Sequence, residues 1–175
     1  DILAKCLDDI LQWDIQLVFL GAGDRYYSDL FGNLPKKYPG KVGTYIGFNV
    51  ELSHLIEAGS DFFLMPSYFE PCGLNQMYSM TYGTLPIVHA IGGLKDTVEN
   101  FDVKNNRGTG FAFNDMTEDA LKNPIGWALH SWYHEKEALK KAQIRAMKKD
   151  FSWKQSIKQY DQVFKSAIAR KKGWH

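Results

Sequence analysis

The sequence predicts an α/β fold, a Rossmann-like parallel sheet flanked by helices, with extra helices at its C-terminal end. Short apolar runs alternate with amphipathic stretches, which favours parallel strands joined by right-handed crossovers. Glycine-rich turns follow two of the apolar runs, as in folds that bind ligands at strand ends. The 175 residues, 45% of them hydrophobic, are enough for a single domain, residues 1–175, with its own core.

The first part of the chain contains three predicted helices and two predicted strands. An amphipathic helix at the start leads directly into a buried strand, so we expect the first strand of the sheet to be absent from this chain. Gly21 and Gly23 follow that strand, but Tyr26 replaces the third glycine of a dinucleotide-binding turn, so no such site is expected. Pro35 is expected to end the second helix. The predicted helices are 1–14, 24–34 and 50–58, and the strands are 15–20 and 42–48.

The rest of the chain contains three predicted strands and a larger group of helices. Gly83 is expected to end one helix, and Asn123-Pro124 to begin another as its N-cap and first residue. An apolar stripe from Trp153 to Ile168 indicates an amphipathic last helix. The predicted strands are 61–65, 85–90 and 111–113, and the helices are 73–82, one from near 95–97, one from 123, 137–149 and the last one.

The stretch between the strand at 61–65 and the helix at 73–82 is the predicted functional turn. In open α/β sheets, ligands bind where a parallel strand ends and a helix begins. The free N–H groups of the first helical turn attract an anion, and Glu70 lies just before them. This arrangement suits a substrate with a phosphate at one end and a hydroxyl-bearing group at the other.

Charge and cysteine content narrow the function classes. Basic residues gather after residue 135, but they follow helical periods, so we interpret them as solvated helix faces and expect no nucleic-acid partner. No run of 18 apolar residues exists, so no membrane partner is expected. Cys6 and Cys72 fall in no metal or redox spacing, and the histidines form no ligand set, so we expect no metal, no cofactor and a reducing compartment.

Three motifs stand out in the chain: Phe69-Glu70-Pro71-Cys72-Gly73-Leu74-Asn75-Gln76, Tyr82-Gly83-Thr84-Leu85-Pro86-Ile87-Val88 and Gly92-Gly93-Leu94-Lys95-Asp96-Thr97-Val98. These motifs closely resemble the starch and bacterial glycogen synthases. The resemblance implies that the chain is the C-terminal, sugar-nucleotide-binding half of a GT-B fold. Such glycosyltransferases move glucose from ADP-glucose, less often UDP-glucose, to the non-reducing end of an α-1,4-glucan with retention of configuration.

The same resemblance implies roles for single residues. Glu70 matches the glutamate that contacts the reacting end of the donor glucose, and it is the expected catalytic residue. Tyr78 stands where the wider GT-B group often has a ribose-binding glutamate. Phe48 stands at an adenine-stacking position, although it also fits a core position, and Cys72 fits packing beside the glucose without reactivity. The implied nucleotide-sugar-binding residues are Phe48, Cys72, Gly73, Leu74, Asn75, Tyr78, Gly92 and Gly93.

The resemblance further implies that much of the enzyme lies outside this chain. An N-terminal GT-B domain supplies much of the acceptor site in the family, and an arginine and a lysine that neutralise the diphosphate precede the region matched here. We therefore expect a fragment that is inactive alone, from a protein of the bacterial cytoplasm or a plant plastid. Two alternatives remain: a non-catalytic sugar-nucleotide- or glucan-binding module of GT-B type, and another GT-B enzyme such as an epimerase or a phosphorylase.

Overall fold

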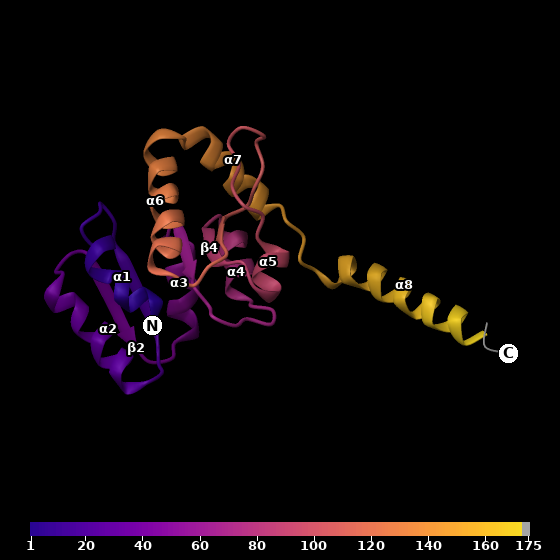
Figure 1. The fold of residues 1–175 in the computed structure, drawn as a ribbon, viewed down its shortest axis with the longest axis horizontal. Coiled ribbons are helices and arrows are strands. Elements are labelled where there is room, and N and C mark those ends of the chain that lie inside the picture. The colour runs from indigo at the N-terminus through magenta and orange to yellow at the C-terminus, as the bar shows by residue number, and fades with distance from the viewer. Residues whose placement is uncertain (173–175) are drawn as a thin grey trace.

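The computed structural model describes residues 1–172, apart from the side chains of residues 155 and 172. Helices and strands alternate through most of this part, as the apolar pattern predicts (Figure 1). In chain order they are α1 (Ile2–Ile10), β1 (Leu17–Gly21), α2 (Arg25–Lys37), β2 (Val42–Ile46), α3 (Val50–Gly59), β3 (Phe62–Met65), α4 (Asn75–Tyr82), β4 (Leu85–His89), α5 (Gly92–Thr97), β5 (Phe111–Phe113), α6 (Glu118–His134), α7 (Lys136–Met147) and α8 (Trp153–Lys172).

The five strands form two separate parallel sheets. β1 pairs with β2, with Leu17 opposite Val42. In the second sheet β4 lies between β3 and β5, and all its pairings are parallel. The predicted class, α/β with parallel strands flanked by helices, is confirmed. The difference from the expected single sheet is that β1 and β3 are not hydrogen-bonded to each other.

The core is centred on β4, whose five residues are all buried. Met80 of α4, Leu94 of α5 and Leu121 of α6 are completely buried in the same cluster. Aromatic rings extend it, since Phe111 of β5 packs edge-on against Trp127 of α6 with their centroids 5.2 Å apart. This packing fixes the starts of α4 and α5, which follow β3 and β4 and carry most of the predicted site residues.

Two predicted helix boundaries at prolines are wrong. Pro35 does not end α2, which continues to Lys37. Because proline has no backbone N–H, it cannot donate the helical hydrogen bond to the Phe31 carbonyl. That carbonyl instead accepts a hydrogen bond from Thr44 Oγ1 at 3.0 Å. Asn123-Pro124 does not begin a helix either, because α6 starts six residues earlier than Pro124, at Glu118. The cap is Thr117, whose hydroxyl accepts from the Ala120 N–H at 3.2 Å.

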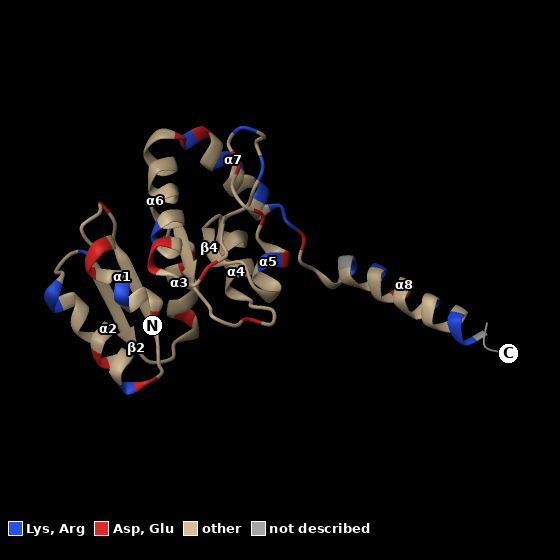
Figure 2. Ribbon diagram, in the orientation of Figure 1, with Lys and Arg blue, Asp and Glu red and all other residues tan. Residues whose placement is uncertain are grey.

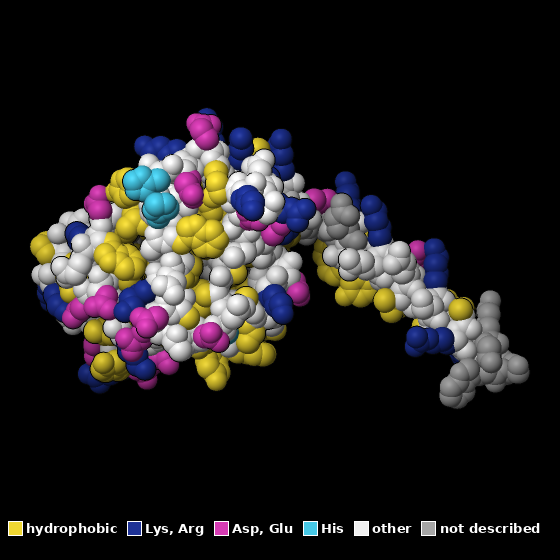
Figure 3. All heavy atoms as spheres, turned by 45° about the horizontal axis from the view of Figure 1, so that its top comes forward, with side chains coloured by type: hydrophobic (Ala, Val, Ile, Leu, Met, Phe, Trp, Pro, Cys, Tyr) yellow, Lys and Arg dark blue, Asp and Glu magenta, His cyan; other side chains and the backbone are white. Residues whose placement is uncertain are grey.

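The last helix, α8, projects away from the rest of the molecule (Figure 1). The predicted amphipathic stripe is present, but its side chains are exposed rather than packed on the body, with Trp153 69% and Phe164 63% exposed. Lysine and arginine residues recur along the helix (Figure 2), and the space-filling view shows apolar side chains gathered along one side (Figure 3). Among the described residues, no helix combines the length and apolar character needed to cross a membrane.

Candidate functional site

The predicted turn leaves the carboxyl end of β3 and enters α4 at Asn75. Gly73 has φ +72°, a left-handed conformation that favours glycine and that aims the chain into the helix. Leu74 is the N-cap residue, and no side chain caps the first turn of α4. The Met77 N–H already donates to the Leu74 carbonyl at 2.9 Å. The N–H groups of Leu74, Asn75 and Gln76 are therefore the ones left for an acceptor from outside the helix. The predicted helix start is observed within two residues, and Gly83, with φ +85°, ends α4 as expected.

Gly92 and Gly93 lie directly against this turn. A Cβ on Gly92 would run into the carbonyl of Glu70, and one on Gly93 would lie 2.5 Å from Cys72 Cα. The Gly93 N–H also donates to the Pro71 carbonyl at 3.3 Å. Only residues without a side chain allow the start of α5 to approach the turn this closely. The glycine pair therefore determines the shape of the backbone that carries Glu70 and Cys72.

Gln76 holds the same turn from the inside, a role that sequence reasoning missed. Its side chain is fully buried, and Nε2 lies 3.0 Å from the Cys72 carbonyl, 3.1 Å from the Gly73 carbonyl and 3.1 Å from Thr97 Oγ1. Thr97 in turn donates to the Gly93 carbonyl at 2.5 Å. The sequence does contain a signal for this role, because Gln76 is an amide side chain in the first turn of a predicted helix, just after Gly73.

His89 links the turn to the loop that follows β5. The sequence analysis did not predict this role. The ring is 7% exposed at the end of β4. Its Nδ1 lies 2.8 Å from the Ser67 carbonyl and its Nε2 lies 3.0 Å from the Asn114 carbonyl. A buried ring with a carbonyl at each nitrogen fixes the separation of two loops at the carboxyl edge of this sheet.

The side chains of the predicted residues differ in exposure. Glu70 is half-buried, whereas Cys72 is a free, exposed thiol and Leu74 is 53% exposed. Tyr78 lies on α4, 41% exposed, with its ring 5.6 Å from that of His54. Phe48 is 87% exposed in the loop after β2, so the alternative interpretation of it as a core residue is wrong.

The structure thus gathers most of the predicted residues in one place. Glu70, Cys72, the start of α4 and the Gly92-Gly93 pair meet at the carboxyl ends of β3 and β4. Phe48 belongs to the carboxyl edge of the other sheet, after β2. Asn75 also lines a cavity of about 820 Å³ that runs between the two sheets. Asn75 is the one predicted site residue that lines this cavity, and Glu70 and Cys72 do not.

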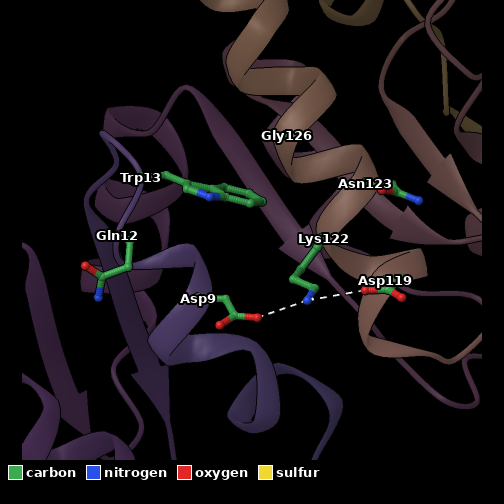
Figure 4. A pocket seen from close by; sticks show the side chains of 7 residues that line it. All are labelled: Asp9, Gln12, Trp13, Asp119, Lys122, Asn123 and Gly126. Atoms are coloured by element: carbon green, nitrogen blue, oxygen red, sulfur yellow. Dashed lines mark hydrogen bonds and ion pairs between the residues drawn. The ribbon is translucent and has the colours of Figure 1, made fainter.

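A second cavity, of about 560 Å³, lies between α1 and α6 (Figure 4). Lys122 forms ion pairs there with Asp9 at 2.9 Å and with Asp119 at 3.3 Å, while Trp13 extends over the same space. None of the predicted site residues lines it. Within the described part of the chain, no group of three or more histidine, cysteine and acidic side chains could hold a metal ion.

Residues 1–149 match the family model described as glycosyl transferases group 1. The chain belongs to that family. Among its relatives, glycogen synthase 1 of Geobacter sulfurreducens is 51% identical over 173 residues, and that of Geobacter metallireducens is 50% identical over 173 residues. Each alignment covers 99% of this chain and 34% of the relative, so the chain spans about a third of the curated relatives it matches.

Solved structures agree with the sequence relatives. The catalytic domain of starch synthase IV from Arabidopsis thaliana, bound to ADP and acarbose, superposes with a TM-score of 0.83 at 29% identity, over 96% of this chain and 35% of that one. The sucrose-phosphate synthase of Thermosynechococcus elongatus has the same fold, with a TM-score of 0.64 at 23% identity over 96% of this chain and 42% of that one. The resemblance to the starch and bacterial glycogen synthases is therefore confirmed in sequence and in fold.

Proposed function

We propose that this chain is the donor-binding part of a glycogen or starch synthase. The complete enzyme transfers glucose from ADP-glucose, or from UDP-glucose, to the non-reducing end of an α-1,4-glucan with retention. The observation that carries the proposal is the uncapped start of α4, placed beside Glu70 by the contact of Gly92 and Gly93 with the turn. The glycogen synthase relatives and the starch synthase structure support it.

The start of α4 is the proposed diphosphate site. Breaking the glucosyl–phosphate bond leaves negative charge on the departing diphosphate, and aligned N–H groups at a helix start stabilise such charge. One well-placed donor of this kind contributes about 3 kcal/mol to the transition state when the site excludes water. Gly73, Leu74 and Asn75 supply the backbone for this contact, and no cofactor beyond the donor is needed.

The remaining residues are assigned to the sugar and the base. Glu70, half-buried next to the start of α4, positions the donor glucose and stabilises the positive charge that develops on its ring. Cys72 lies beside the glucose as a contact and not as a nucleophile. The exposed ring of Phe48 is a stacking platform for the base. Tyr78 borders the ribose from the next turn of α4.

The proposed partners are the nucleotide sugar, the glucan acceptor and an N-terminal domain of the same protein. That domain contributes much of the acceptor site and the cations that complete the diphosphate site. The 175-residue chain alone then binds nucleotide weakly and does not elongate glucan. Cytoplasm in a bacterium, or the plastid in a plant, is the proposed location.

Calorimetric titration of the chain with ADP, UDP and ADP-glucose tests these assignments. Phe48→Ala is expected to weaken all three ligands, while Glu70→Gln weakens ADP-glucose and leaves ADP unchanged. Phe164→Ala is the matched control, since that ring is also exposed and belongs to α8, which projects away from the rest of the molecule (Figure 1). Equal binding by both site variants and the parent would remove the roles of Phe48 and Glu70. Glucan elongation by the isolated chain would contradict the proposal that the N-terminal domain is needed for the acceptor site and the diphosphate cations.

A further inference from the structure

The cavity between α1 and α6 has no role in the proposed donor site. Its volume, about 560 Å³, lies in the range of about 300–1,000 Å³ that is typical of small-ligand sites. Trp13, in the bend after α1, precedes the amino end of β1, whereas the donor site follows the carboxyl ends of β3 and β4. The cavity is therefore separate from the donor site. The residues that line it are Asp9, Gln12, Trp13, Asp119, Lys122, Asn123 and Gly126 (Figure 4).

Trp13 is a fixed aromatic wall of this cavity. Its backbone N–H donates to the Ile10 carbonyl at 3.1 Å, and its carbonyl accepts from Lys41 Nζ at 2.8 Å. The side chain is half-buried, and the indole N–H has no hydrogen-bond partner among the described residues. An indole offers an apolar face and a single donor. This wall therefore suits a ligand that has both C–H surfaces and hydroxyl groups.

The polar groups of the lining favour a neutral ligand over an anion. Lys122 lies between Asp9 and Asp119, at 2.9 and 3.3 Å, so two carboxylates already surround the ammonium group. A phosphate would need cations that are not neutralised in this way. The other polar side chains are the amides of Gln12, on the α1 side, and Asn123, on the α6 side. Amides and carboxylates together supply donors and acceptors for hydroxyl groups.

Gly126 keeps the cavity open at a cost to α6. It lies in the interior of that helix, where glycine is less favourable than alanine by about 1 kcal/mol. A Cβ at this position would lie 3.8 Å from Trp13 Cη2, which is an ordinary contact distance. Packing therefore does not require glycine here. What the absent side chain does provide is open space beside the indole ring.

We propose that the cavity between α1 and α6 binds a saccharide chain, with the C–H face of one sugar ring packed on Trp13. Hydroxyl groups of the saccharide bond to the amides of Gln12 and Asn123 and to the Asp9 carboxylate. The choice of saccharide rests on the proposed function, which makes it the α-1,4-glucan. A glucan held here as well as at the acceptor site raises the effective concentration of its chain ends at the enzyme.

An NMR titration of the 175-residue chain with maltoheptaose tests the proposal. Saturable shift changes are expected for the indole N–H of Trp13 and the side-chain amide of Asn123. Gly126→Leu fills the space beside the indole and should weaken this response at least about tenfold, or about 1.4 kcal/mol. Gly126→Ala is the matched control, because its methyl group only reaches contact distance. It should melt at a higher temperature than the parent and keep the response.

Three outcomes would overturn the proposal. One is a Trp13 indole signal that maltoheptaose leaves unmoved, or that responds equally in the parent and in Gly126→Leu. Another is a lower melting temperature for Gly126→Ala, which would show that packing requires the glycine. The third is an indole signal that responds to inorganic phosphate but not to maltoheptaose, which would assign the cavity to an anion. ADP binding is followed through the amides at the start of α4, so the donor site and this cavity can fail independently.

Discussion

Replacing Gly93 by alanine should distort the turn that carries Glu70. A Cβ at this position would lie 2.5 Å from Cys72 Cα, whereas ordinary contacts begin near 3.4 Å, so backbone must move by about an ångström. The movement also weakens the hydrogen bond from Gly93 N–H to the Pro71 carbonyl, which is already 3.3 Å long. Overpacking of this kind costs about 2–3 kcal/mol. In a chain of this length that lowers the melting temperature by roughly 4–12 °C.

Thermal unfolding and ADP titration measure the two consequences. Gly59→Ala is the control, because Gly59 has open space around its Cα and no positive φ. We expect Gly93→Ala, but not Gly59→Ala, to melt at lower temperature and to bind ADP about tenfold more weakly, which corresponds to about 1.4 kcal/mol. If the two variants melt together and bind ADP equally, the glycine contact does not shape the site.

Three further changes test other parts of the structure. Gln76→Leu removes the donor from two turn carbonyls and should cost about 1–3 kcal/mol in urea unfolding; an unchanged midpoint would show that the buried amide is dispensable. Burial raises the pKa of the Glu57 carboxyl above its ordinary 4.5, and His54 opposes part of that shift. The folded chain therefore binds the proton of the Glu57 carboxyl more tightly than the unfolded chain does. Stability should therefore fall as pH rises from about 4.5 through the raised pKa, and Glu57→Gln should flatten this dependence; parallel pH profiles of the two proteins would contradict the assignment. Thr44→Val leaves the Phe31 carbonyl without its donor and should cost about 1 kcal/mol by the same unfolding assay, and a variant as stable as the parent would refute the account of Pro35.

The alternation of strands and helices could be predicted because it is encoded locally. Apolar runs such as Phe62–Met65 and Leu85–His89 are strands in the structure, and the stripe beginning at Trp153 is helical. Turn chemistry was equally informative, since Gly83 does end α4. Each of these features depends on residues close together in the sequence.

The features that escaped prediction depend on distant residues. Pro35 remains inside α2 because Thr44, on a strand nine residues later, satisfies the freed carbonyl. Gln76 and His89 act on loops that only the folded sheet brings within reach. The division into two sheets follows from strand neighbours, which a strand's own sequence does not specify.

The most direct test of the donor site is an amide NMR titration of the chain with ADP. The account predicts that the largest shift changes fall on Leu74, Asn75 and Gln76 at the start of α4, and that Phe48→Ala weakens the response without relocating it. Saturable binding of ADP that leaves these three amides unmoved, while residues elsewhere respond, would contradict it.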